Sequence, residues 1–100
     1  MVQATTPTFV LTLPQTVNLE QAENVYFTFE QVGRKITKTG TDLTISGNTV
    51  TVSFTQQETV LMSVAQAQLQ LNWTYADGSR ACSNIETVEV TKNLLNEVKE

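Results

Sequence analysis

The sequence contains no histidine and a single cysteine, Cys82. Histidine is the commonest proton shuttle in enzymes, and zinc sites are built mainly from histidine and cysteine. Their scarcity excludes most hydrolase mechanisms and the usual zinc ligand sets, so we expect neither a metal nor another cofactor. One cysteine cannot form an internal disulfide framework. Because Cys82 lies in an expected strand, we expect it to be a small buried apolar residue.

Charge is also sparse, because charged residues make up 16% of the chain and the formal net charge is −4. The lysines and arginines are scattered, so no basic stripe is available to neutralise phosphates. We therefore expect no nucleic-acid partner. The low charge and the many Thr, Gln, Asn and Ser residues are more typical of extracellular or virion modules than of cytosolic enzymes.

No segment approaches the ~20 apolar residues of a membrane span. The first residues have no basic region ahead of an apolar stretch, so we expect no secretion signal. A chain of 100 residues can bury one core. We expect a single domain, with its core in residues 8–90 and a C-terminal tail in residues 91–100.

Alternation of apolar and polar residues dominates the chain and indicates half-buried β-strands. The alternating segments in the first half are TFVLTL, VYFTFEQ, KITK, LTIS and TVTVSF. Gly47-Asn48, between the last two, predicts a hairpin. We expect the last four segments to form a meander. The side chains expected to point inward are Phe9, Leu11, Leu13, Val25, Phe27, Phe29, Leu43, Ile45, Val50, Val52 and Phe54.

Two short segments favour helical turns. Thr55 and Glu58 have the spacing of a capping box, which predicts a helical crossing between sheets near residues 56–62. A single turn is also expected at residues 18–21. In the tail, Leu94, Leu95 and Val98 have helical spacing after Asn93, a possible cap. A helix this short needs its apolar side covered, so we expect it to dock on its own domain or on a neighbour.

The stretch QLQLNWTYADGSRA places Trp73 and Tyr75 on one face of an expected strand. We interpret this face as core, with Tyr75 closing one end beside the turn at Asp77-Gly78. An exposed binding platform is the alternative. The opposite face is polar and either contacts a neighbour or faces solvent. It consists of Gln68, Gln70, Asn72 and Thr74.

The last expected strand, RACSNIETVEV, changes the parity of its inward positions. Ala81, Ser83 and Ile85 are odd, whereas Val88 and Val90 are even. A parity change of this kind predicts a β-bulge, which we expect near Glu86-Thr87. About seven short strands separated by turns indicate an all-β fold, an immunoglobulin-like β-sandwich. A small closed barrel is the alternative.

Few residues suggest chemistry. The carboxylate pairs are Glu20 with Glu23 and Glu86 with Glu89, and we interpret the first pair as a solvated edge rather than a catalytic cleft. We therefore expect no enzyme activity and no small-molecule substrate. The candidates for an interface are the tail residues Leu94, Leu95 and Val98, together with Tyr26 on an outward strand position.

The order of TFVLTLP, NLEQAENVYFTFEQ, KTGTDLTISGNTVTVSFTQQET, LQLNWTYADGSRACSNI and a final NLL resembles a known family. It is similar to the small immunoglobulin-like proteins of tail and baseplate gene clusters in phages and prophages of Gram-positive bacteria, and in particular to the N-terminal module of upper baseplate proteins. The segment Thr55–Thr59 and the strand that ends at Asp77-Gly78 carry most of the resemblance.

The resemblance implies a non-enzymatic component of a virion, made in the bacterial host cytoplasm. Its partners would be other virion proteins and a further copy of itself, in a homo-oligomer. The resemblance carries no functional residues to this chain. The alternative hypothesis is an adhesion or carbohydrate-binding module, which needs exposed aromatic side chains. Tyr26, Trp73 and Tyr75 are the candidates for that role.

Overall fold

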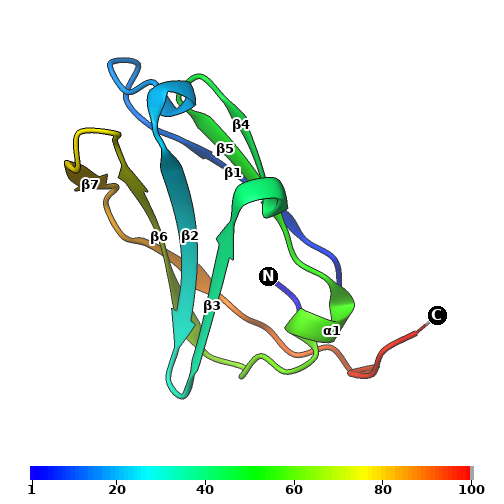
Figure 1. Ribbon diagram of the computed structural model, residues 1–100. Coiled ribbons are helices and arrows are strands. Elements are labelled where there is room, and N and C mark those ends of the chain that lie inside the picture. Colours follow the sequence, from blue (N-terminus) through cyan, green and yellow to red (C-terminus); the bar gives the residue numbers. More distant parts are fainter. Residues whose placement is uncertain (100) are drawn as a thin grey trace.

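The computed structural model describes residues 1–99, which form eight strands in two antiparallel sheets with little helix (Figure 1). The smaller sheet has the order β1-β5-β4, and its strands are β1 (Thr8–Thr12), β4 (Leu43–Ser46) and β5 (Thr49–Ser53). The larger sheet has the order β3-β2-β6, and both β7 and β8 pair with the other side of β6. Its strands are β2 (Asn24–Gln31), β3 (Arg34–Thr39), β6 (Gln66–Thr74), β7 (Arg80–Cys82) and β8 (Glu86–Glu89).

The two sheets share one hydrophobic core, as expected for two packed layers. Every side chain predicted to point inward in the first half of the chain is buried or packed against this core. Phe54 lies at its centre, where its ring meets those of Phe9, Phe27 and Phe29 edge-on at centroid distances of 6.1, 5.8 and 5.7 Å. The alternation in the sequence therefore predicted the core face of these strands correctly.

The predicted meander is wrong, because its four strands are divided between the sheets. β2 and β3 pair in the larger sheet, whereas β4 and β5 form the Gly47-Asn48 hairpin in the smaller one. The chain crosses between the sheets at the 3₁₀ turn η2 (Gly40–Asp42). Alternation identifies the buried face of a strand but not its neighbours. In an immunoglobulin constant-type sandwich the second strand lies in the sheet of the first, fourth and fifth. Here it pairs with the third and the sixth.

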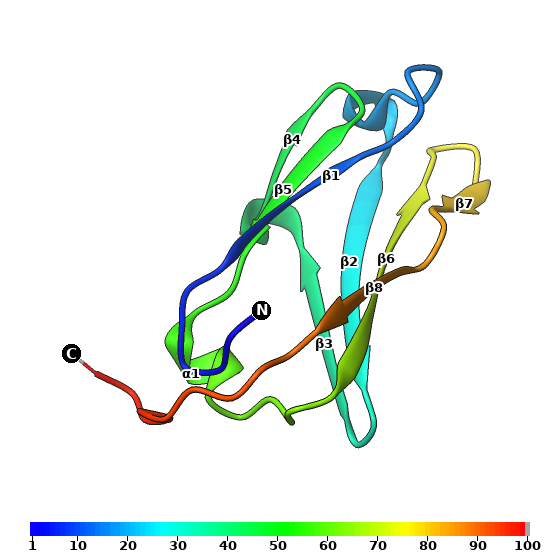
Figure 2. The same cartoon turned by 180° about the vertical axis from the view of Figure 1, so that it is seen from behind.

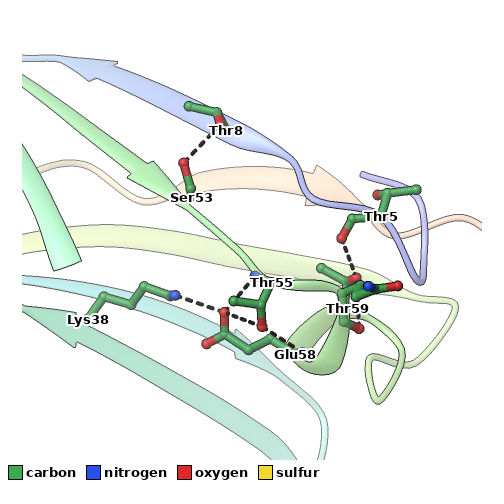
Figure 3. Close-up of polar contacts among 8 residues, drawn as sticks. Thr5, Thr8, Lys38, Ser53, Thr55, Glu58 and Thr59 are labelled. Carbon is green, nitrogen blue, oxygen red and sulfur yellow. Dashed lines mark hydrogen bonds and ion pairs between the residues drawn. The ribbon is translucent and has the colours of Figure 1, made fainter. Parts of the chain in front are cut away.

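The predicted capping box forms at the helix α1 (Gln56–Thr59), which is shorter than the expected crossing of residues 56–62. The Thr55 hydroxyl accepts the Glu58 N–H at 3.2 Å, and the Glu58 carboxylate accepts the Thr55 N–H at 2.8 Å (Figure 3). The other expected turn is the 3₁₀ helix η1 (Leu19–Gln21), capped by Asn18. Glu58 also pairs with Lys38 at 2.8 Å, which ties α1 to β3.

A bulge divides the last expected strand into β7 and β8. Cys82 lies opposite Asn72, and Glu86 lies opposite Leu69, so three residues of this segment face only two residues of β6. The bulge is therefore at residues 83–85, slightly earlier than the predicted Glu86-Thr87. Ile85 is exposed instead of pointing inward, because it belongs to the bulge. No helix within residues 1–99 is long and apolar enough to cross a membrane.

Candidate functional site

Trp73 and Tyr75 belong to the core. Trp73 is 4% exposed, and its indole N–H donates to the Tyr75 hydroxyl at 3.0 Å. Tyr75 is half-buried at the end of β6, where it satisfies the one polar atom of the indole. The interpretation of this face as core is confirmed for Trp73. The two rings do not form an exposed platform.

Tyr26 lies on the outer face of the larger sheet, half-buried between Thr39 and Asn72 on the flanking strands. Cys82 continues this row beside Asn72 and is exposed. The expectation that Cys82 is buried is therefore wrong, because the pairing of Ala81 with Trp73 turns Ala81 inward and Cys82 outward.

The same outer face carries a shallow hollow of about 280 Å³. Its lining is Thr28, Glu30, Lys35, Gln68, Gln70, Asn72, Arg80 and Ile85. These described residues include no aromatic side chain. The polar row predicted from the sequence therefore forms part of a polar surface, to which the Arg80 guanidinium contributes by donating to the Asn72 side chain at 3.1 Å.

A second concave surface, larger than the polar hollow, lies where the two sheets are open to each other along one side. It is a groove of about 650 Å³ between β1 and the β7–β8 segment, and we call it the seam. The seam is lined by Phe9, Val10, Leu11, Thr12, Leu13, Pro14, Val17, Leu69, Trp73, Cys82, Ser83, Asn84, Glu86, Thr87 and Val88. Figure 2 shows the two bordering strands, β1 in blue and β8 in orange-brown. The floor of the seam therefore consists of side chains at the edge of the core, among them Leu11, Leu69 and Trp73.

One wall of the seam is the edge of β1. Among the described residues β1 pairs only with β5. Leu13 donates its N–H to Asn48, and Phe54 donates its N–H to Pro7. Antiparallel ladders alternate, so the odd residues of β1 bond β5 and the N–H and C=O groups of Thr8, Val10 and Thr12 point outward. β1 consequently presents a row of backbone groups that β5 does not use.

The other wall of the seam is the bulge. The Ser83 hydroxyl accepts the N–H of Leu71 at 3.0 Å, while the Ser83 N–H donates to the Leu71 carbonyl at 2.9 Å. The Ser83 hydroxyl thus takes the place of a backbone carbonyl as hydrogen-bond acceptor. The Leu71 N–H of β6 therefore keeps a partner at the position where the register shifts. Backbone polar groups in such a partly buried position need partners. The bulge can therefore border an apolar groove without leaving β6 unpaired there.

The N-terminal segment closes the seam at one end. Residues 1–3 run along the continuation of β8, where the Met1 ammonium donates to the Glu89 carbonyl at 2.9 Å and the Gln3 N–H donates to the Thr91 carbonyl at 3.0 Å. The chain then crosses to the smaller sheet before β1 begins at Thr8. Thr59 fixes this crossing by donating its hydroxyl to the Thr5 carbonyl at 2.7 Å (Figure 3). The seam is thus open only beyond this crossing.

The tail does not form the predicted helix; residues 92–99 contain bends and no helix. Its apolar side chains are exposed, Leu94 by 93%, Leu95 by 54% and Val98 by 38%. Polar contacts hold its backbone instead. The Lys99 N–H donates to the Gln56 side-chain carbonyl at 2.9 Å, and the Gln56 amide donates back to the Lys99 carbonyl. Without coverage of its apolar side, so short a helix has too little stabilisation.

The structure separates the predicted interface residues. Leu94, Leu95 and Val98 belong to the tail. This segment, red in both views, runs beside α1 at the margin of the molecule (Figures 1 and 2). Tyr26 lies on the outer face of the larger sheet and does not line the seam. The seam itself was not predicted. Its one sequence signal was Val10, an apolar residue at an outward position that is 62% exposed.

The two carboxylate pairs identified in the sequence lie on the surface. Glu20, Glu23, Glu86 and Glu89 are exposed. Within residues 1–99, no group of three or more His, Cys, Asp or Glu side chains is placed so that it could hold a metal ion. Burial acts to raise the pKa of the Glu58 carboxyl, but hydrogen bonds from Lys38 and from the Thr55 backbone, with the Lys38 charge, lower it below its ordinary value. Glu58 is thus a helix cap and an ion-pair partner.

Comparisons with protein-family models, with curated proteins and with solved structures found no match for this chain.

Proposed function

We propose that this protein is a non-enzymatic assembly module of a phage virion, of the tail or baseplate, and that it works through protein–protein contacts. The observation that carries the contact role is the distribution of its apolar side chains. The phenylalanines and Trp73 are packed between the sheets, whereas Leu94, Leu95 and Val98 are exposed on the tail. Exposed apolar side chains grouped on one segment are typical of an interaction site.

The virion assignment comes from the resemblance of the sequence to phage tail and baseplate proteins. The low charge of the chain and a rigid two-layer fold are compatible with it. The proposal does not depend on immunoglobulin-type connectivity, because a rigid sandwich with free edges suffices to present contact surfaces.

The adhesion or carbohydrate-binding alternative requires exposed aromatic rings. Trp73 is buried and donates to Tyr75, which leaves Tyr26 as the aromatic of the three on an outer face. The polar hollow beside it is what favours this alternative. A glycan array probed with the labelled protein tests it, and binding that Asn72→Ala abolishes would favour the alternative over an assembly role.

The experiment that tests the assembly role is the purification of particles from the producing host, followed by detection with an antibody against this protein. We expect the protein to co-sediment with tails and to remain after washing at high salt. Co-purification of defined tail proteins with the tagged full chain is the second readout. If the protein were absent from particles and from every complex with tail proteins, the assignment to a virion would be refuted.

A further inference from the structure

We propose that the seam receives the C-terminal segment of a second copy of this chain, which adds as a strand to the free edge of β1. This inference deepens the proposed function, since it names a partner surface for the exposed tail. It does not depend on the identity of the particle. Strand addition to a sheet edge is a common way in which proteins bind an extended segment.

The seam has the two features that strand addition requires. The outward backbone groups of Thr8, Val10 and Thr12 can form ladder hydrogen bonds, which supply affinity for any extended chain. The apolar floor beneath them, which includes Leu11 and Trp73, can receive alternate side chains of the added strand. A sheet edge of this kind invites pairing with another chain unless it is covered.

The tail has the matching features. Its residues are not helical, and in an extended strand Leu94 and Val98 lie on one side while Leu95 lies on the other. Leu94 and Val98 would enter the seam. Leu95 would then lie on the outer side of the smaller sheet, where Val10 is exposed. Each exposed apolar side chain of the tail thereby gains an apolar neighbour.

Length and charge agree with this placement. The five residues of β1 span about 17 Å, and residues 93–99 span about 23 Å when extended. Glu86 is the one charged residue among those that line the described seam. Glu97 would lie on the side of Leu95, away from the floor of the seam. Docking of residues 93–99, the described part of the tail, therefore buries no carboxylate in the groove.

The chain's own tail is directed away from its own seam. Asn93 donates its side-chain amide to the Gln3 carbonyl at 2.9 Å, next to the crossing that closes the seam, and Lys99 is held at Gln56 on α1. The donor must therefore be another copy. Each copy then gives one tail and receives one, an arrangement that closes into a dimer or ring or continues as a filament.

The test uses the full chain and two variants that block opposite halves of the contact. Val10→Pro removes an outward N–H while retaining the ladder to β5, and Val10→Thr is its matched control because it keeps the N–H. Leu94→Ser with Val98→Ser removes the apolar side of the tail. Leu61→Ser with Val64→Ser is the matched control, because these residues are exposed outside the seam and the tail.

Sedimentation velocity over a concentration series measures the association. We expect the wild type and both controls to associate, and each blocked variant to associate about tenfold more weakly or worse. A mixture of the two blocked variants should form heterodimers, because one supplies the tail and the other the seam. Trp73, the one tryptophan of the chain, lines the seam and should change its emission on association.

Three results would overturn the inference. They are a wild type that stays monomeric at millimolar concentration, association that survives both blocked variants, and loss of association in the Leu61 and Val64 control. If Val10→Pro does not fold, a second experiment takes its place. In it, a synthetic peptide of residues 91–99 is added to the variant Leu94→Ser with Val98→Ser, whose seam is intact. That peptide should shift Trp73 emission, and a scrambled peptide should not; equal responses would also refute the inference. Failure here leaves co-sedimentation with particles as a separate test of the proposed function.

Discussion

Phe54, just after β5, is the side chain that joins the aromatic residues of the core. It is buried, and its ring meets three other phenylalanines, one from β1 and two from β2. The Lys38 ammonium lies over the Phe54 ring, 5.0 Å from its centroid. Phe54 therefore joins the two sheets at one point, and the core depends on its volume.

We expect Phe54→Ala to lower the free energy of unfolding by about 3–5 kcal/mol, the range found when a buried phenylalanine leaves a cavity. Urea denaturation measures this loss. Val32→Ala is the control, since Val32 is almost fully exposed at the turn between β2 and β3 and its replacement should cost no more than about 0.5 kcal/mol. Similar losses for both variants would contradict this account of the core.

Glu58 makes stability depend on pH. Its pKa is lower in the folded protein than its ordinary value of 4.5, so it favours folding above that value, and this contribution is lost as pH falls through the folded pKa. Glu58→Gln keeps a capping side chain but loses the charge. We expect this variant to be less stable than wild type by about 0.5–1 kcal/mol at neutral pH. The two should converge as the pH falls below the folded pKa of Glu58.

Urea unfolding of both proteins over a series of decreasing pH values measures this difference. Glu58→Ala, which also removes the cap, should lose about 1 kcal/mol more at neutral pH. A difference between wild type and Glu58→Gln that stays constant with pH would show that the carboxylate charge does not contribute.

Among strands and segments, the bulge between β7 and β8 makes the most specific prediction. Ser83→Ala removes the hydroxyl that accepts the Leu71 N–H. An N–H left unsatisfied in a partly buried position costs about 1–3 kcal/mol. We expect a loss of unfolding free energy in this range, together with faster hydrogen exchange at the Leu71 amide.

Ser53→Ala is the matched control for the bulge. Ser53 is exposed, and its hydroxyl pairs with that of Thr8 on the surface of the smaller sheet. Its replacement should change the stability by no more than about 0.5 kcal/mol. If Ser83→Ala were as mild as this control, water would be satisfying Leu71 and the bulge would not need the serine.

The sequence predicted the local features of these segments well where local physics determines them. The capping box at Thr55 and the hairpin at Gly47 depend on residues a few positions apart, and both formed as expected. The prediction of a helix in the tail was wrong, because it considered the local pattern without the packing that a short helix needs. The spacing of Leu94, Leu95 and Val98 suits a helix, but spacing alone does not overcome the cost of nucleating one. The exposed side chains show that no packing supplies the difference.

The arrangement of the two sheets was beyond reach of the sequence. Alternation showed that Phe27 and Trp73 point inward. The same alternating pattern is expected whether β4 pairs with β3 in a meander or, as here, the chain leaves the sheet after β3 through η2. The seam arises from that arrangement, because it needs β1 and β8 at matching edges of different sheets. Pairing between distant segments determines such a site, and one sequence does not report it.

At the scale of the whole molecule, the burial of Trp73 between the two sheets distinguishes the assembly role from the adhesion alternative, which requires exposed aromatic rings. A buried indole is poorly reached by an aqueous quencher, so acrylamide should quench the native protein several-fold less efficiently than the urea-unfolded chain. The urea-unfolded chain is the control. Equal quenching in both states would mean an open ring, and it would favour an exposed binding platform.

The central claim is that β1 has a free edge that another copy of the chain covers. Residue-resolved hydrogen exchange tests it most directly. In dilute protein we expect slow exchange at Phe9 and Leu11, whose N–H groups bond β5, and at Leu13, whose N–H donates to the Asn48 carbonyl. We expect fast exchange at Thr8, Val10 and Thr12. At high concentration the fast set should become protected in wild type but not in Leu94→Ser with Val98→Ser. Uniform protection along β1 at every concentration, or a fast set that never slows, would contradict the claim.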